Sequence, residues 1–351
     1  MKQEMAVSLL DENKYQQWND LVARAPAGSV YSNTDYLSVL CRATGGVFRV
    51  VGVFKGDQLF GGIALYEKKT RSGRMLSNRL LLYYNGIVLA PSTSSYPSER
   101  TSRELAVLSA LEGWLSRVGY SHAVIHSRAP IRDLRVFASG GWGVRPSYSY
   151  VVDFRDLTSA WGRVEQNLRR LVKRCESGGA VLAEDGDFDS FYRLHRETHE
   201  RKGAPIYLPE KEFRKYVEEL RGLGLAKLFH ARTAQGETMA SQLVLASGHP
   251  VCHTVCAGAD KKFLSQGATP FLRWKVFEWL SRAGYTANDL TDASLNDVTH
   301  FKSQLGGDLE MNLVLTGPDR FSYRFFQQFG SIKSRGMSVV NKLRSVSHKK
   351  A

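Results

Sequence analysis

The heptapeptide WLSRVGY at residues 114–120 recurs as WLSRAGY at residues 279–285, and this repeat constrains the fold more than any other feature. Each copy is followed by a strand-like run, a short segment that ends in Gly-Gly, and a second strand-like run. Before each copy, alternating apolar residues flank a turn, at residues 55–57 and at residues 235–237, as in a β-hairpin. The sequence therefore predicts one mixed α/β unit that is used twice.

The length fits this duplication, because 351 residues can form two cores of about 150 residues each. We predict an N-terminal domain over residues 1–155, a C-terminal domain over residues 156–318, and a basic, aromatic tail over residues 319–351. The boundary lies near a predicted helix over residues 158–177, which has apolar side chains at helical spacing. These are Trp161, Val164, Leu168, Leu171, Val172 and Cys175.

The other face of this predicted helix is basic, with Arg163, Arg169, Arg170, Lys173 and Arg174. Two interpretations are open: the face binds a phosphorylated ligand, or it is simply solvated. The net charge of +14 is concentrated further along, since residues 320–350 contain eight Lys or Arg and no acid. That tail fits either an anionic membrane surface or RNA, or else a solvated basic end.

Composition favours a globular protein, with 43% hydrophobic and 23% charged residues. No apolar run approaches the roughly 20 residues that cross a bilayer, and the first residues lack the pattern of a secretory signal. The four cysteines are scattered, which indicates a reducing compartment. We therefore expect a cytoplasmic protein, with the tail as a route to peripheral contact with the inner face of the membrane.

Metal binding is not predicted. Cys252 and Cys256 lie on a predicted strand, where residues four apart are about 13 Å from each other, too far to share one zinc ion. His195 and His199 are one helical turn apart, but no third ligand accompanies them. The chain also lacks a Gly-x-Ser-x-Gly elbow and a Gly-Lys-Ser/Thr phosphate loop, which argues against hydrolases and NTPases.

Four segments in order along the chain resemble the Fem family of peptidoglycan-bridge aminoacyl transferases and their acyltransferase relatives. They are LRRLVKRCESGG, FYRLHRETHERKG, LSQGATPFLRWKVFEWLSRAGY and HFKSQLGG. The resemblance implies two tandem acetyltransferase-like (GNAT) domains with mixed α/β sheets. It also implies an N-acyltransferase of cell-envelope biogenesis, in which an amine attacks the activated carbonyl directly and no enzyme nucleophile is needed.

Donor binding is predicted at Gln266, Gly267, Ala268 and Thr269, just before a predicted helix over residues 271–283. Free backbone N–H groups at a helix start bind phosphates, and in GNAT domains coenzyme A binds there. An ordinary helix cap is the alternative. The first repeat has residues 98–102 at this place, without a glycine. No cofactor is expected to stay bound, and we expect acyl-CoA as co-substrate, slightly ahead of aminoacyl-tRNA.

The resemblance also assigns the remaining site. Phe301 and Lys302 match a pair in which the lysine stabilises charge on the acyl carbonyl, while the first repeat has Phe137 and Ala138. From their position on or just after the preceding predicted strand, two aspartates either suit proton transfer or amine binding or cap the next turn: Asp289 and Asp292. Basic and hydroxyl side chains are predicted to hold the acceptor, an amine of a cell-envelope or polysaccharide precursor: Thr198, Arg201, Arg170 and Arg174. The alternative is a catalytically decayed module that binds RNA or an anionic membrane.

Overall fold

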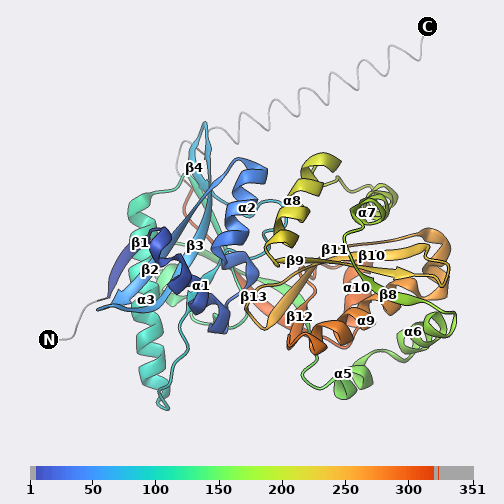
Figure 1. The fold of residues 1–351 in the computed structure, drawn as a ribbon. Coiled ribbons are helices and arrows are strands. Elements are labelled where there is room, and N and C mark those ends of the chain that lie inside the picture. Colours follow the sequence, from blue (N-terminus) through green and yellow to red (C-terminus); the bar gives the residue numbers. More distant parts are fainter. Residues whose placement is uncertain (1–4, 320–322, 324–351) are drawn as a thin grey trace, which may run out of the picture.

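The computed structural model describes residues 5–319 and residue 323, and within them the elements follow the same order twice (Figure 1). The first half opens with a strand and two helices, continues with a hairpin, and ends in helix, strand, short helix and strand. Its elements are β1 (Ala6–Leu10), α1 (Tyr15–Arg24), α2 (Thr34–Thr44), β2 (Val47–Lys55), β3 (Gln58–Thr70), β4 (Gly73–Leu76), β5 (Ile87–Leu89), α3 (Pro97–Val118), β6 (His122–Ser127), α4 (Arg135–Ser139) and β7 (Gly143–Asp153).

The second half begins with two additional helices and then repeats the order. Its elements are α5 (Leu157–Arg163), α6 (Gln166–Ser177), β8 (Val181–Glu184), α7 (Phe188–Lys202), α8 (Glu210–Gly222), β9 (Ala226–Arg232), β10 (Thr238–Leu245), β11 (Val251–Ala259), α9 (Ala268–Arg282), β12 (Ala287–Asp289), α10 (Asp297–Ser303) and β13 (Asp308–Thr316). The duplicated α/β unit and both hairpin turns are thus confirmed. The strands β1, β4, β5 and β8 were not predicted from the sequence.

The two halves share one continuous sheet because they exchange their last strands. In the described part of the chain, 13 strands form a sheet with the order β1-β2-β3-β4-β6-β13-β7-β12-β11-β10-β9-β8, and β5 pairs with β3. Strand β7 of the first half pairs with β12, whereas β13 of the second half pairs with β6. Strands β7 and β13 also pair with each other, antiparallel and along their length. Each half therefore completes the sheet of the other.

Apolar packing also joins the halves on one face of the sheet. A single hydrophobic core combines α1 and α2 with α7 and α8, and it includes Trp18, Tyr36, Phe213 and Tyr216. Helix α2 lies beside α8 in Figure 1, and the hydroxyl of Tyr216 donates to that of Tyr36 at 3.1 Å. Two further cores lie under α3 and between α6 and α9, and each includes a residue of the exchanged strand, Leu315 of β13 in the first and Val152 of β7 in the second. Each Å² of apolar surface that is removed from water stabilises a fold by about 25 cal/mol. The shared core therefore joins the two halves strongly.

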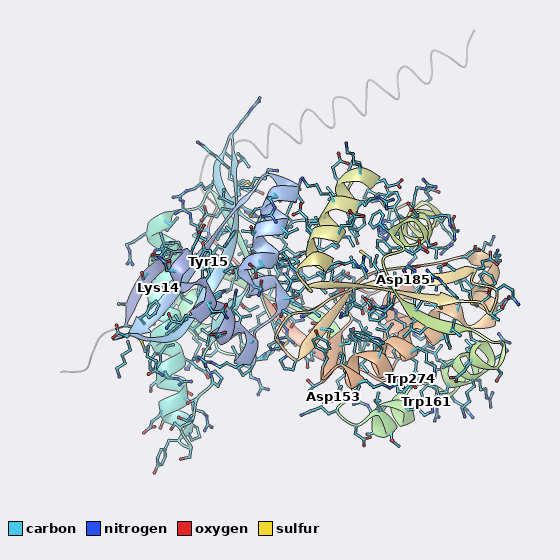
Figure 2. All side chains as sticks on the ribbon, in the orientation of Figure 1. Lys14, Tyr15, Asp153, Trp161, Asp185 and Trp274 are labelled. Carbon is cyan, nitrogen blue, oxygen red and sulfur yellow. The ribbon has the colours of Figure 1, made fainter. Side chains whose placement is uncertain are left out.

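We expect one helix over residues 158–177, but the structure has two, α5 and α6. The expectation is therefore wrong between Arg163 and Gln166. Val164 has an extended backbone, with φ −67° and ψ 135°, and it ends α5. The N–H of Glu165 donates to the carbonyl of Gln304 at 3.0 Å instead of continuing the helix. Helix α5 packs on α9 through the rings of Trp161 and Trp274, whose centroids are 4.5 Å apart (Figure 2).

Among the described residues, no helix is long and apolar enough to cross a membrane. The predicted tail over residues 319–351 lies outside the described residues except for Asp319 and Tyr323, so its proposed contact with a membrane or RNA stays a prediction. The proposed boundary at residues 155/156 falls between the end of β7 and the start of α5.

Candidate functional site

A cavity opens where the parallel strands β11 and β12 part. They pair from Val251↔Ala287 to His253↔Asp289. Beyond this pair β11 continues to Ala259, whereas β12 ends and the segment after it turns away. Ligands of open α/β sheets bind beyond the carboxyl ends of such strands. A cavity of about 210 Å³ lies here. It is lined by Tyr83, His195, Thr198, His199, Lys202, Ala204, Tyr207, Thr254, Val255, Cys256, Ala257, Arg273, Leu290, Thr291, Asp292, Val298 and Lys302.

Lys302, from α10, is the half-buried cation of this cavity. Its Nζ donates to the carbonyl oxygens of Thr291 and Asp292, at 2.7 and 2.6 Å. Burial, followed by the neighbouring charge of Arg273, lowers the pKa of Lys302 to about 8. An ammonium has three N–H donors, so one remains for a group in the cavity. The residue before it, Phe301, packs instead against the core of the second half.

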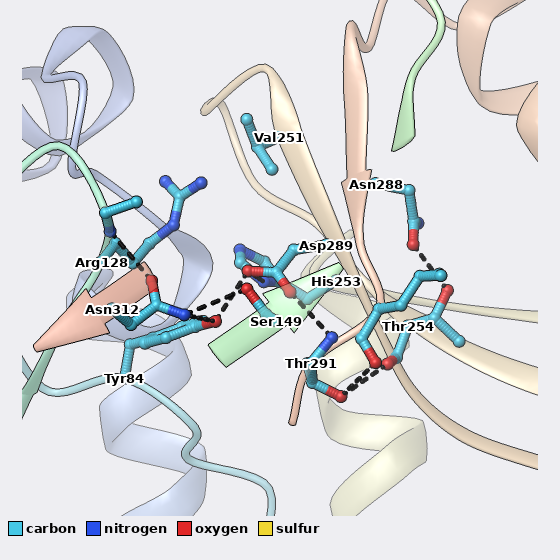
Figure 3. Close-up of polar contacts among 12 residues, drawn as sticks. Tyr84, Arg128, Ser149, Val251, His253, Thr254, Asn288, Asp289, Thr291 and Asn312 are labelled. Atoms are coloured by element: carbon cyan, nitrogen blue, oxygen red, sulfur yellow. Dashed lines mark hydrogen bonds and ion pairs between the residues drawn. The ribbon is translucent and has the colours of Figure 1, made fainter. Parts of the chain in front are cut away.

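The loop that holds Lys302 depends on an unusual backbone conformation at Thr291. Thr291 has φ +53°, which is uncommon for a branched residue and marks strain at many functional sites. Its N–H donates to Oδ1 of Asp289 at 2.7 Å and its hydroxyl donates to the carbonyl of Thr254 at 3.1 Å (Figure 3). These bonds fix the carbonyl that receives the ammonium of Lys302.

The two predicted aspartates occupy different environments. Asp289 is 1% exposed and does not line the cavity; burial raises its pKa, and its oxygens accept from Thr291 and from the Tyr84 hydroxyl at 2.9 Å. Figure 3 shows it within a polar cluster that reaches into the first half. Asp292 is exposed at the edge of the cavity, and its Oδ1 accepts from the Ser294 hydroxyl at 2.7 Å. Of the two, Asp292 is therefore the one that a substrate can reach.

Helix α7 provides the opposite wall. Thr198 lines the cavity, and its hydroxyl is 3.4 Å from Nη2 of Arg201, which is exposed outside the lining. His195 is 1% exposed, both ring nitrogens lack a hydrogen-bond partner among the described residues, and burial followed by His199 lowers its pKa to about 3. His195 is therefore a neutral imidazole in this wall. No group of three or more His, Cys, Asp or Glu residues within the described residues is arranged to hold a metal ion.

The predicted donor segment begins α9 as expected, although the helix starts three residues earlier than predicted. Gly267 caps it with φ +90°, and a Cβ built there would lie 2.6 Å from the carbonyl oxygen of Leu171 in α6. Glycine is thus required for the approach of two helices as well as for the turn. Ala268 is fully buried, Thr269 is partly exposed and Gln266 is exposed. Binding of a donor phosphate at this segment stays a prediction.

Two of the arginines assigned to the acceptor, Arg170 and Arg174, do not line the cavity that contains Thr198. Arg170 and Arg174 are exposed on α6, and Nη2 of Arg174 donates to the carbonyl of Ser265. Arg174 and Gln266 share a second cavity of about 230 Å³. The structure therefore places Arg174 beside the predicted donor segment, and neither arginine lines the cavity of Lys302.

Sequence reasoning missed one prominent residue of the cavity, Arg273. It is 9% exposed on α9, and its Nε and Nη1 have no hydrogen-bond partner among the described residues. The signal was its place in the apolar run FLRWKVF, where a solvated arginine is not expected. Two residues of other segments were also missed, Tyr83 and Tyr207, since only the folded chain brings them to the cavity.

Comparisons with known proteins agree with this geometry. Residues 162–303 match the family model described as an acetyltransferase (GNAT) domain. The crystal structure of FemX superposes with a TM-score of 0.68 at 12% identity, covering 88% of this chain and 96% of that one.

Two further structures are similar over the same extent. A tandem GNAT protein from the clavulanic acid biosynthesis pathway has a TM-score of 0.53 at 13% identity, covering 90% of this chain and 100% of that one. The structure of L-PGS from Bacillus licheniformis has a TM-score of 0.53 at 13% identity, covering 88% and 93%. No curated protein sequence gives a significant match. The chain therefore has the tandem-GNAT fold, as its sequence predicts.

Proposed function

We propose that the protein is an N-acyltransferase, on the premise that residues 162–303 match the GNAT acetyltransferase domain and that the chain has a tandem-GNAT fold. It would move an acyl or aminoacyl group from an activated donor to an amine. The observation that carries the proposal is the position of Lys302, a half-buried ammonium held on two carbonyls at the end of the separating strands.

In the proposed reaction, the neutral amine attacks the carbonyl carbon of the donor. The free N–H of the Lys302 ammonium donates to the carbonyl oxygen, where negative charge develops, and this is the step at which such a cation accelerates acyl transfer. Asp292, at the edge of the cavity, accepts the proton from the attacking nitrogen. The new C–N bond forms, the bond to the leaving thiolate or ribose oxygen breaks, and the leaving group takes the proton.

We propose acyl-CoA as the donor, ahead of aminoacyl-tRNA, because a GNAT domain implies a donor of that type. The start of α9 and the basic face of α6 lie together, since Arg174 contacts the carbonyl of Ser265. In this proposal Arg170 and Arg174 bind the phosphates of the donor, and they do not bind the acceptor. The acceptor would be an amine of a cell-envelope or polysaccharide precursor, which is the part of the proposal that rests on resemblance alone.

A transfer assay tests the proposal. The full chain is incubated with acetyl-CoA, longer acyl-CoAs or charged tRNA together with amine acceptors, and mass spectrometry detects the amide product. Lys302→Ala is expected to slow product formation by about 10²–10³-fold, whereas Lys211→Ala, at an exposed position on α8, is expected to leave it unchanged. Equal product from Lys302→Ala and the wild type would contradict the role of Lys302. Nucleic acid or vesicle binding without transfer from any donor would favour the decayed module.

A further inference from the structure

Arg273 is a buried cation with two nitrogens that no described residue satisfies. It projects from α9 into the 210 Å³ cavity lining, it is 9% exposed, and neither Nε nor Nη1 finds an acceptor among the described residues. Buried polar groups in native proteins are almost always paired, and an unpaired buried charge is especially costly. Because this unpaired, buried guanidinium lies at the wall of a cavity, we infer that a ligand in the cavity accepts its hydrogen bonds.

The surroundings of Arg273 do not neutralise it. Burial raises the pKa of the neighbouring Cys256 thiol, which therefore stays uncharged. The lysines and arginines of the cavity lining are Lys202, Arg273 and Lys302, and they face a single carboxylate, Asp292. Repulsion between like charges acts on Lys302, since the charge of Arg273 is the second cause of its lowered pKa, behind burial. The cavity thus has an excess of positive charge that an anion would balance.

We propose that Arg273 binds a carboxylate of the acceptor, and that the part of the acceptor that enters the cavity is an amine-bearing acid of about the size of a single amino acid. The inference rests on the proposed acyl transfer for the role of the ligand, but the binding site itself does not. A planar carboxylate matches the fork of a guanidinium, which can donate two parallel hydrogen bonds to it.

The dimensions and lining of the cavity support this class of ligand. The cavity of about 210 Å³ is compatible with a small ligand of the size of an amino acid. Several lining side chains are apolar or aromatic: Tyr83, Tyr207, Leu290 and Val298. A neutral aliphatic side chain suits these walls, while the carboxylate suits Arg273.

Binding of the carboxylate would also act on Lys302. Neutralising Arg273 removes one of the two leading causes of the lowered pKa of Lys302, namely the nearby positive charge. The lysine then stays protonated to higher pH. Acceptor binding would in this way keep the ammonium charged at the moment when it is needed.

Ligand-induced thermal shifts of the full chain test the site without any transfer step. The probes are L-alanine, L-valine and L-leucine, each compared with its primary amide, and inorganic phosphate. The variants are Arg273→Gln and, as a matched control, Arg282→Gln, at an exposed position of the same helix. We expect the acids to raise the Tm of the wild type and of Arg282→Gln, and the amides to raise it at least fivefold less. Arg273→Gln is expected to lose the shift.

The Tm without ligand distinguishes a binding role from a structural one. Removing an unpaired buried charge should leave the Tm of Arg273→Gln equal to that of the wild type or higher. A lower Tm would instead mean that Arg273 has a structural partner, and would overturn the proposal. It is equally overturned by equal shifts from acids and amides, by shifts that persist in Arg273→Gln, by a response to phosphate alone, or by no shift with any probe. Acid-specific shifts without amide formation in the transfer assay would leave the carboxylate site standing and remove the proposed function.

Discussion

The hydroxyl of Tyr84, in the first half, donates a 2.9 Å hydrogen bond to the carboxylate of Asp289, in the second. The other oxygen of Asp289 accepts the N–H of Thr291, whose carbonyl receives the ammonium of Lys302. A side chain of the first half is therefore connected, through three successive hydrogen bonds, to the lysine of the candidate active site. This connection gives the first repeat a physical role in the second.

Tyr84→Phe is expected to destabilise the fold, because it leaves a buried carboxylate oxygen without its donor. Hydrogen bonds to charged groups contribute about 1.5–3 kcal/mol, and urea unfolding should show a loss in that range. Tyr96→Phe is the control, since Tyr96 is 64% exposed. A Tyr84→Phe protein as stable as this control would mean that the bond contributes nothing to joining the halves.

A pair of glycines isolates the cost of the contact between α6 and α9. Gly267 and Gly284 have nearly the same φ, +90° and +91°, but only at Gly267 would a Cβ meet a neighbour, the carbonyl oxygen of Leu171. Gly284→Ala should cost about 1–2 kcal/mol for the left-handed backbone alone. Gly267→Ala should cost about 1–3 kcal/mol more through overpacking. Chemical denaturation of both variants measures the difference, and equal losses would exclude the close approach.

Buried histidines make the stability depend on pH. Burial lowers the pKa of His195 to about 3, below the unfolded value of about 6.5, so the unfolded chain takes up the proton first. The stability from neutral His195 is fully present above pH 6.5 and falls as the pH drops toward 3. Between pH 7.5 and 5.5 the loss is about 1.4 kcal/mol.

His195→Phe should remove that part of the pH dependence, because a phenyl ring keeps the stacking with Phe191 but does not titrate. Unfolding free energies at pH 7.5 and 5.5 give the comparison. The wild type should lose about 1.4 kcal/mol more than the variant over this interval. An equal loss in both would mean that His195 is protonated in the folded protein or exposed to solvent.

The rate of transfer should fall at alkaline pH if Lys302 acts as a cation. Its pKa of about 8 keeps the ammonium charged below that pH, and the charge is lost as the pH rises through it. Lys302→Arg retains a positive charge at every accessible pH. The alkaline limb of kcat/KM should therefore be present in the wild type and absent in Lys302→Arg. A limb that persists in the variant belongs to another group.

The fold could be predicted from the sequence because its main signals are local and occur twice. The recurrence at residues 114–120 and 279–285 gave the order of elements, and period-two alternation gave the hairpins. The exchange of β7 and β13 could not be predicted, since nothing in a strand's own residues selects a partner from the other half. The break at Val164 was also hidden, because its apolar side chain keeps the helical spacing across α5 and α6.

The candidate site was predicted in part, and for a similar reason. Resemblance pointed to Lys302, Asp292 and Thr198, which the structure brings to one cavity. It could not separate Asp292 from Asp289, whose difference in burial arises from the Tyr84 contact across the halves. The sequence also could not show that Arg170 and Arg174 lie outside this cavity, since the direction of α6 depends on how it packs against α9. Whether any of these residues takes part in transfer stays a prediction.

The most direct test of the central claim is kcat for amide formation by Lys302→Ala beside a matched change in the first repeat, Ala138→Lys. Loss of one oxyanion-stabilising donor costs about 10²–10³ in kcat, so we predict a fall of that size for Lys302→Ala with KM for the donor little changed. Ala138 is exposed on α4, and its replacement should leave kcat within about twofold of the wild type. A kcat for Lys302→Ala equal to that of the wild type would contradict the account.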